Sequence, residues 1–189
     1  MMAVSRLVLV RHAMPETDPG TPAPLWHLGT AGRAAARAMR PLLPVPAYLV
    51  ASDEPKAVAT LREMSGEPEI ATDADVGEVR RPHVWSPRHR SLARSYVAGV
   101  CHEGWEPHDR VAARFDRAVV RHAAAATGRT LVIGTHGMAP TVWLASRMRL
   151  DPDPAEFWAD LRFPDVLDVD LAAGTVRRVR GDQAPTMAG

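Results

Sequence analysis

Three short apolar stretches of this chain each end in residues that can bind or attack an anion. The stretches and the residues that follow them are 7–10 before Arg11-His12, 48–51 before Ser52-Asp53, and 130–134 before Thr135-His136-Gly137. A neutral imidazole is a competent nucleophile near pH 7, because its ordinary pKa is about 6.5. An arginine guanidinium carries its positive charge on a planar fork of donors. The pattern therefore predicts a nucleophile beside a fixed cation at the end of the first stretch.

The elements that position these residues are predicted to be strands of a parallel sheet. Residues 7–10 are apolar throughout, as expected for a strand that is buried on both faces. The carboxyl ends of parallel strands share one edge of a sheet, and ligands of open α/β folds collect there. We therefore expect His12, the turn at Ser52 and His136 to lie close together, although they are far apart in the sequence.

Helical patterns between the strands predict an α/β sandwich with right-handed crossovers. The predicted helices cover residues 31–43 with Thr30 as N-cap, 53–64 with Asp53 as N-cap and Pro55 in the first turn, 85–99, 104–128 and 140–148. Residues 65–80 form an acidic passage in which we expect little strand. Residues 166–171 and 175–179 flank Ala172-Ala173-Gly174 and predict a hairpin at one edge of the sheet.

The composition is typical of one globular domain with balanced charge. A chain of 189 residues buries about 70% of its unfolded surface, and we expect a single domain over residues 1–182 with a disordered tail over 183–189. The net charge of +1 favours neither a nucleic-acid nor a membrane partner. No apolar run approaches the roughly 20 residues of a transmembrane helix. The lone cysteine, Cys101, and the lack of a leader pattern favour the cytoplasm.

Four motifs, in this order, resemble those of the histidine phosphatase superfamily, which has the phosphoglycerate-mutase-like fold. They are Arg11-His12-Ala13, the turn from Ser52 to Lys56-Ala57-Val58-Ala59-Thr60, Glu78-Val79, and His136-Gly137. The family has Arg-His-Gly at the first motif and Arg-Ala-x-x-Thr at the second, so this chain departs from the pattern at Ala13 and Lys56. The resemblance extends over roughly residues 4–140.

The resemblance implies a three-layer α/β/α sandwich with a mostly parallel central sheet, and a phosphatase that hydrolyses a phosphomonoester. His12 would carry the phosphoryl group, and Glu78 would protonate the leaving group and then activate water. Arg11, Lys56 and His136 would contact the phosphate oxygens. The resemblance implies no cofactor and no metal, and the histidines lack the spacings of a zinc site.

These roles leave alternatives open. We expect a raised pKa for Glu78 beside a phosphate, but Glu78 could also be a solvated loop acid, and Lys56 could be an exposed helix residue. The substrate is expected to be a small phosphorylated molecule. A mutase that returns the phosphoryl group to a bound product is one alternative function. The other is a weakly active phosphate-binding or regulatory protein, which the lysine at position 56 keeps open.

Three tryptophans in segments near the predicted strand ends are candidates for the roof of the site. Trp26, Trp85 and Trp105 could contact a substrate there or simply pack in the core. Trp105 and the neighbouring Glu106 are the candidate substrate-binding residues of this region. Glu106 could equally cap the helix that follows it.

Overall fold

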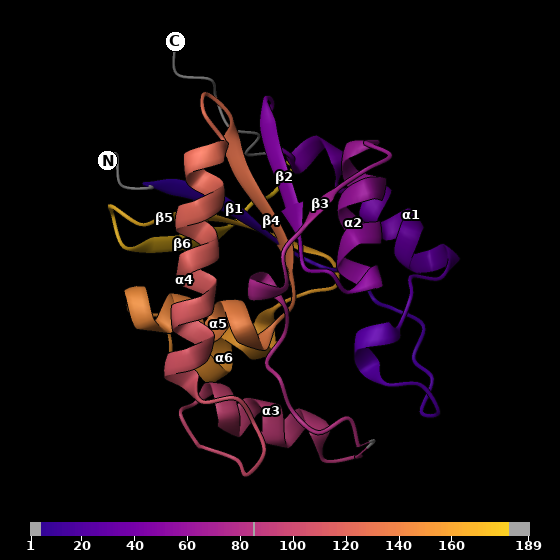
Figure 1. Cartoon of the computed structure of the whole chain (residues 1–189), viewed down its shortest axis with the longest axis vertical. Coiled ribbons are helices and arrows are strands. Elements are labelled where there is room, and N and C mark those ends of the chain that lie inside the picture. The colour runs from indigo at the N-terminus through magenta and orange to yellow at the C-terminus, as the bar shows by residue number, and fades with distance from the viewer. Residues whose placement is uncertain (1–4, 85, 182–189) are drawn as a thin grey trace.

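A six-stranded sheet forms the centre of the protein (Figure 1). The computed structural model describes residues 5–84 and 86–181. The strands are β1 (Arg6–Arg11), β2 (Ala47–Ala51), β3 (Ala71–Thr72), β4 (Thr130–Thr135), β5 (Asp165–Asp170) and β6 (Thr175–Arg178). Their order across the sheet is β3-β2-β4-β1-β5-β6. The strands that precede His12 and His136, β1 and β4, are therefore neighbours in the middle of the sheet.

The sheet is parallel except at one edge. Strand β4 pairs in parallel with both β1 and β2, and β2 pairs in parallel with β3. Strand β5 runs antiparallel to β1, and β6 runs antiparallel to β5. The mostly parallel sheet and the hairpin at its edge are thereby confirmed. The acidic passage contributes only the two residues of β3.

Helices cover both faces of the sheet. They are α1 (Thr30–Ala38), α2 (Pro55–Ser65), α3 (His89–Val97), α4 (His108–Ala125), α5 (Met138–Arg147) and α6 (Pro154–Asp160), with short 3-10 turns η1 (Ala23–Leu25), η2 (Arg40–Leu42) and η3 (Ala74–Val76). Within the described residues, no helix is both long and apolar enough to cross a membrane.

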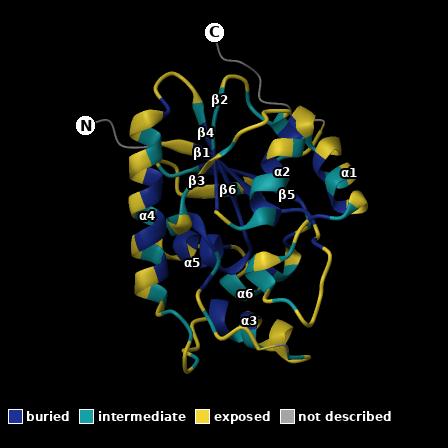
Figure 2. Cartoon of the chain, turned by 45° about the vertical axis from the view of Figure 1, so that its right-hand side comes forward, coloured by how far each residue is buried: buried dark blue, intermediate teal, exposed yellow. Residues whose placement is uncertain are grey.

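Two apolar layers, one on each face, hold the helices to the sheet. Successive side chains of a strand point to opposite faces, so Val8 and Val10 pack with α1 and α2, whereas Leu7 and Leu9 pack with α4 and α5. Figures 1 and 2 show the two helix layers on either side of buried strands. The predicted three-layer sandwich is confirmed.

The helix starts and ends differ from the predictions for local reasons. The helix predicted to reach Leu43 stops at Ala38, because Pro41 has no N–H to continue the hydrogen-bond ladder. Gly29 and Glu54 occupy the N-cap positions predicted for Thr30 and Asp53, and neither makes a side-chain capping bond.

Later in the chain, α3 begins at His89 instead of residue 85, since Pro87 disfavours a helical conformation at Ser86. Helix α4 begins at His108 and α5 at Met138. The sequence analysis missed α6, although Asp153 caps it by accepting two backbone N–H bonds. Trp85 and the predicted tail over 183–189 lie outside the described residues. The single domain over 1–182 stays a prediction.

Backbone pairing brings the three predicted strand ends together. The N–H of His12 donates to the Thr135 carbonyl at 3.0 Å, and the N–H of Ser52 donates to the Gly134 carbonyl at 2.8 Å. Helix α2 packs so closely on β4 that a Cβ at Gly134 would lie 2.8 Å from Leu61 Cγ. The close packing and the strand register confine these polar residues to one edge of the sheet, as predicted.

Candidate active site

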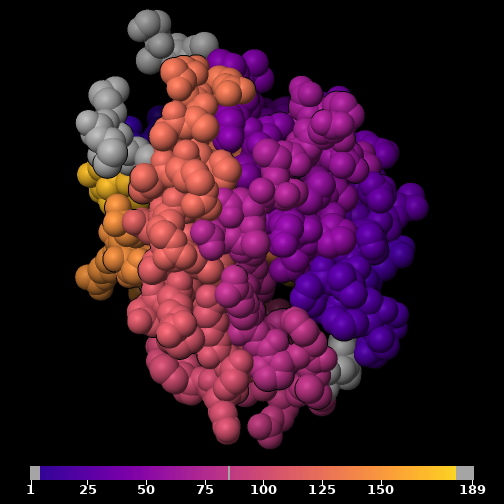
Figure 3. All heavy atoms as spheres, viewed as in Figure 1, coloured from indigo at the N-terminus to yellow at the C-terminus, as the bar shows by residue number. Residues whose placement is uncertain are grey.

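A cavity of about 520 Å³ opens at the carboxyl edge of the parallel strands. Its lining includes the following residues from the predicted motifs: Arg11, His12, Lys56, Glu78, His136 and Gly137. Figure 3 shows the surface hollowed where the indigo N-terminal segment meets the magenta segment that follows β3. The structure therefore brings together the five residues that were predicted to be catalytic.

His12 is buried at the end of β1, with 7% of its surface exposed. Its Nδ1 lies 2.8 Å from the Ala13 carbonyl oxygen. A carbonyl can only accept, so Nδ1 carries the proton and Nε2 keeps its lone pair. Burial lowers the pKa of His12 well below its ordinary value, and the neighbouring His136 lowers it further. His12 is thus a neutral imidazole held in the tautomer of a nucleophile.

Arg11 is held at the wall of the cavity by two contacts. Its Nη1 donates to the Leu161 carbonyl at 2.9 Å, and its guanidinium carbon lies 3.6 Å from the centroid of the Phe163 ring. Its buried Nε makes no hydrogen bond to any described residue. Burial lowers the pKa of Arg11 to about 10, so the cation persists at neutral pH and retains a donor for an anion.

His136 lies beside His12 at the end of β4, and the two ring centroids are 5.1 Å apart. Its Nε2 lies 2.8 Å from Ser52 Oγ and 3.3 Å from Glu54 Oε1. Burial lowers the pKa of His136 well below its ordinary value, and the charge of Lys56 lowers it further. In the empty site His136 is therefore neutral.

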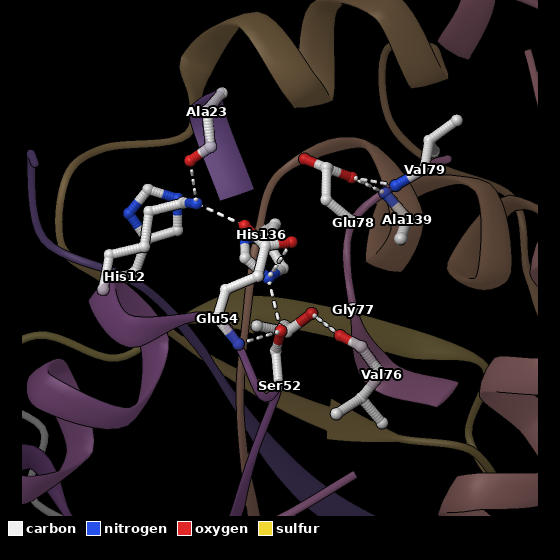
Figure 4. Close-up of polar contacts among 12 residues, drawn as sticks. His12, Ala23, Ser52, Glu54, Val76, Gly77, Glu78, Val79, His136 and Ala139 are labelled. Atoms are coloured by element: carbon white, nitrogen blue, oxygen red, sulfur yellow. Dashed lines mark hydrogen bonds and ion pairs between the residues drawn. The ribbon is translucent and has the colours of Figure 1, made fainter. Parts of the chain in front are cut away.

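Lys56 is a buried cation of the cavity, in contrast to the exposed helix residue that was the alternative. It lies in the first turn of α2, is 5% exposed, and donates from Nζ to the Ala23 carbonyl at 2.8 Å. Its other partner is the carboxylate of Glu54. That carboxylate also lies beside His136 (Figure 4). Sequence analysis missed Glu54 as a site residue, and the available signal was an acid between Ser52 and Lys56 in the predicted phosphate turn.

Glu78 caps the N-terminus of α5. Its Oε2 accepts from the N–H groups of Gly137 and Met138, both at 3.2 Å. Its Oε1 accepts from Ala139 at 2.8 Å and from Val79 at 2.9 Å. Burial acts to raise the pKa of Glu78, but these backbone donors outweigh it and the pKa is lowered. The raised pKa expected from the sequence applies to Glu78 beside a bound phosphate, and it stays a prediction.

The two candidate substrate-binding residues have different surroundings. Trp105 lines a second cavity of about 530 Å³, which adjoins the first and shares Trp26 and Arg81 with it. Glu106 lines neither cavity. Its two oxygens accept from Arg114 Nε at 2.9 Å and Nη2 at 3.0 Å, and its Oε2 also accepts from the Arg80 N–H. The structure places Glu106 in a buried ion pair that anchors the segment after η3.

Several lining residues were not predicted at all. Trp158 belongs to the missed helix α6, and Phe163 follows it. Arg80, Arg81 and His83 lie between Glu78 and α3, and His89 is the first residue of α3. No periodicity or motif of the sequence separates these residues from ordinary loop residues. Among the described residues, no group of three or more histidine, cysteine or acidic side chains is arranged to hold a metal ion.

Neither a protein-family model nor a curated protein sequence matches this chain. Solved structures match it over nearly the whole length. A mycobacterial glucosyl-3-phosphoglycerate phosphatase with inorganic phosphate has a TM-score of 0.66 and 21% identity, covering 94% of this chain and 96% of its own. A putative alpha-ribazole-5'-P phosphatase from Escherichia coli K-12 has a TM-score of 0.61 and 15% identity, covering 94% and 95%.

The chain has the histidine phosphatase fold. A further match, a protein named mycobacterial hydrolase 1, has a TM-score of 0.65 and 20% identity, and covers 94% of this chain and 98% of its own. The fold that the four motifs implied is thereby confirmed. The histidine phosphatase fold places the cavity at the carboxyl edge of its parallel strands, where the side chains described above converge.

The cap formed by Glu78 predicts a pH-dependent loss of stability in Glu78→Gln. The amide offers one acceptor oxygen to four N–H donors, so we expect the free energy of unfolding at pH 7 to fall by about 1–2 kcal/mol. The folded-state pKa of Glu78 is lowered, so its stabilisation is complete above the unfolded pKa of about 4.3 and is lost as the pH falls through the folded pKa. Denaturant titrations of the wild type and Glu78→Gln at pH 7 and at lower pH measure the difference between their free energies of unfolding.

The matched control is Glu103→Gln, which changes an exposed glutamate. This control should alter the free energy of unfolding by no more than about 0.5 kcal/mol. A Glu78→Gln penalty that stays constant from pH 7 to pH 3 contradicts the cap.

Proposed function

We propose that this protein is a phosphatase that hydrolyses a small phosphomonoester through a phosphohistidine on His12. The proposal rests mainly on His12, which is neutral and lines the cavity of the candidate active site. Its Nδ1–H donates to the Ala13 carbonyl. That arrangement leaves Nε2 as the nucleophilic nitrogen. The fold shared with known phosphatases supports the same reaction class.

The reaction divides into two in-line transfers. In the first, Nε2 of His12 attacks phosphorus, the bond to the ester oxygen breaks, and the departing oxygen takes a proton. In the second, water attacks the phosphohistidine, gives up a proton, and releases inorganic phosphate and neutral His12. Arg11, Lys56 and His136 supply donors around the equatorial oxygens, where negative charge is concentrated.

Glu78 is the proposed proton carrier of both transfers. It must be protonated to serve the leaving group and ionised to activate water, and its lowered pKa favours the ionised form in the empty site. A bound phosphate dianion raises the pKa of a neighbouring carboxyl, because like charges disfavour ionisation. Substrate binding is thus expected to supply the protonated form of Glu78.

The leaving group of the substrate is proposed to extend toward the second cavity. Trp105 belongs to the lining of that cavity, together with Trp26 and Leu92. Trp105 packs near the His89 ring, with centroids 6.5 Å apart. A substrate with an apolar or flat group beside the phosphate would gain contact area there. Of the two candidate substrate-binding residues, Trp105 keeps this role in the proposal, while Glu106 acts through the loop that it anchors.

The cations of the proposed mechanism are side chains, and no metal ion takes part in it. A mutase uses the same first step and is distinguished only by the acceptor of the phosphoryl group. A phosphate-binding or regulatory protein would keep the cavity without forming the covalent intermediate. Detection of that intermediate therefore separates the proposed enzyme from the binding protein, and release of inorganic phosphate separates it from the mutase.

His12→Ala tests the nucleophile. We expect turnover of an aryl phosphate such as p-nitrophenyl phosphate to fall below a few per cent, because no other neutral imidazole is held in the same way at β1. Rapid quenching of the wild-type protein with a ³²P-labelled ester should show an acid-labile, base-stable label that the variant lacks. The labelling should persist in excess EDTA.

The exposed His27 provides the control for His12. His27→Ala should retain both turnover and labelling. Turnover by His12→Ala above a few per cent, with native circular dichroism, argues against the phosphohistidine.

Glu78→Gln tests the proton carrier through the leaving group. An alkyl phosphate has a strongly basic leaving oxygen that needs a proton, whereas a nitrophenolate departs without one. We expect kcat to fall by about a hundredfold or more for alkyl esters and far less for p-nitrophenyl phosphate. Equal losses on both classes would leave Glu78 with its capping role alone.

Lys56→Met and Lys56→Arg test the second cation. Removing one preorganised donor costs on the order of a hundredfold in kcat, so we expect a large loss for the methionine variant. Arginine keeps the charge but is bulkier and forked, so the rate of Lys56→Arg should be intermediate. Inhibition by inorganic phosphate should weaken in the same order. Wild-type kinetics in Lys56→Met would remove Lys56 from the site.

A further inference from the structure

The cavity holds a carboxylate where an anion is expected to bind. Glu54 lines the cavity, and its side chain is 13% exposed. One oxygen accepts from Lys56 Nζ, and the other lies 3.3 Å from His136 Nε2. Glu54 therefore holds Lys56, one of the three groups that were assigned to the phosphate oxygens. It also lies beside a second of these groups, His136 (Figure 4).

The inner cavity sets cations beside carboxylates. Two cations, Arg11 and Lys56, and two carboxylates, Glu54 and Glu78, line it, and His12 and His136 are neutral. Arg80 and Arg81 also line the cavity, and the charge of Arg81 lowers the pKa of both Glu78 and His136. The cavity as a whole therefore attracts an anion, but a phosphate dianion at Lys56 would meet the carboxylate of Glu54. Binding there requires that this carboxylate moves away or takes up a proton.

The two carboxylates differ in how firmly they are held as anions. Three backbone N–H donors at the start of α5, together with the N–H of Val79, stabilise the anionic form of Glu78. Glu54 occupies the N-cap position of α2, but its side chain accepts no N–H of that helix. Its anion is stabilised by Lys56 and by the backbone N–H of Glu78. Burial raises the pKa of Glu54, and this effect exceeds the opposing effect of Lys56. Of the two carboxylates, Glu54 is the one that is closer to accepting a proton.

We propose that Glu54 is a proton-linked gate of the phosphate site: it holds Lys56 while the site is empty, and it takes up a proton when a tetrahedral dianion binds. One proton moves from solvent to a carboxylate oxygen of Glu54, and Lys56 Nζ exchanges the carboxylate for an oxygen of the dianion. Glu54 acts through Lys56 and His136 and is a positioning residue. The inference rests on the proposed function only in taking this cavity as the phosphate site.

Charged and titratable side chains from several elements lie around Glu54 in the cavity. Lys56 lies on α2, His136 follows β4, Arg11 and His12 end β1, and Glu78 precedes α3. Both histidines have lowered pKa values, and Glu78 has a lowered one. In the empty site, Glu54 is thus the inner group whose pKa is displaced upward, toward neutral pH.

Inorganic sulfate is the probe, because it is tetrahedral and stays a dianion from pH 5 to pH 8. Its dissociation constant is measured by calorimetry for the wild type, Glu54→Gln and Glu78→Gln across this range. Glutamine mimics a protonated Glu54, so the difference in sulfate affinity between the wild type and Glu54→Gln should become smaller toward the acid end. Above the free-state pKa of Glu54, the ratio of their dissociation constants should grow by up to about tenfold per pH unit, with Glu54→Gln binding more tightly.

Glu78→Gln is the matched control, since it removes the same charge from the same cavity. The linked proton should persist in Glu78→Gln, because Glu54 is intact there. Titrations in buffers of different ionisation enthalpy should show proton uptake by the wild type and by Glu78→Gln, and about one proton fewer by Glu54→Gln than by the wild type. Uptake that is lost in Glu78→Gln and kept in Glu54→Gln would assign the proton to Glu78, and the ratio between the wild type and Glu54→Gln would then not depend on pH. The proton count of Glu78→Gln tests the assignment even if Glu54→Gln fails to fold.

Three results overturn the proposal. They are a pH-independent ratio between the wild type and Glu54→Gln, sulfate binding by the wild type without proton uptake, and no sulfate binding by either protein. Sulfate binding does not depend on turnover, so the outcome is distinguishable from a failure of the phosphatase. A linked proton in a protein that forms no phosphohistidine supports the gate and rejects the enzyme.

Discussion

The parallel pairing of β1 with β4 is the interaction on which the site depends. The register places Arg11 opposite Thr135, and the next residue, His12, donates its N–H to the Thr135 carbonyl. The chain after each strand must then turn at the same edge, so that His12 and His136 become neighbours. Leu7 and Leu9 on one face and Val8 and Val10 on the other anchor β1 in two apolar layers. A slip of one residue would exchange these faces and turn the strand end away from the cavity.

Burial sets the protonation states of the site, and individual contacts modify them. Low water access keeps both histidines neutral, which suits a nucleophile but leaves His136 without charge. The two carboxylates lie close together but are stabilised differently, because Glu78 has helix N–H donors and Glu54 has a side-chain cation. An enzyme that needs one carboxyl as an anion and another as an acid can be built by such unequal stabilisation.

Those parts of the structure that depend on local sequence patterns could be predicted from the sequence. Apolar runs that end in polar residues predicted β1, β2 and β4, and the shared edge of parallel strands then predicted that His12, Ser52 and His136 meet. Side-chain contacts between residues that only tertiary packing brings together could not be predicted from the sequence. Glu106 forms an ion pair with Arg114 of α4, and both side chains hydrogen-bond to the backbone of the segment after η3. Nothing in the local sequence distinguishes that role of Glu106 from a pocket wall. The capping of α5 by Glu78, about sixty residues earlier in the chain, was likewise not visible, so the lowering of its pKa by those N–H donors was not predicted.

The effect of Lys56 on an incoming anion depends on the neighbouring Glu54. A lone cation in the first turn of α2 would add to the positive end of the helix and attract any anion. With Glu54 two residues before it, the cation has a partner in the empty site and is already desolvated. A ligand must then supply interactions at least as good as those of a carboxylate, which a phosphate dianion does with more charge and more acceptor oxygens. A weak monoanion such as a single carboxylate offers Lys56 no gain over Glu54. In the proposed gate, the pair would therefore lower the affinity for every anion but favour dianions over monoanions.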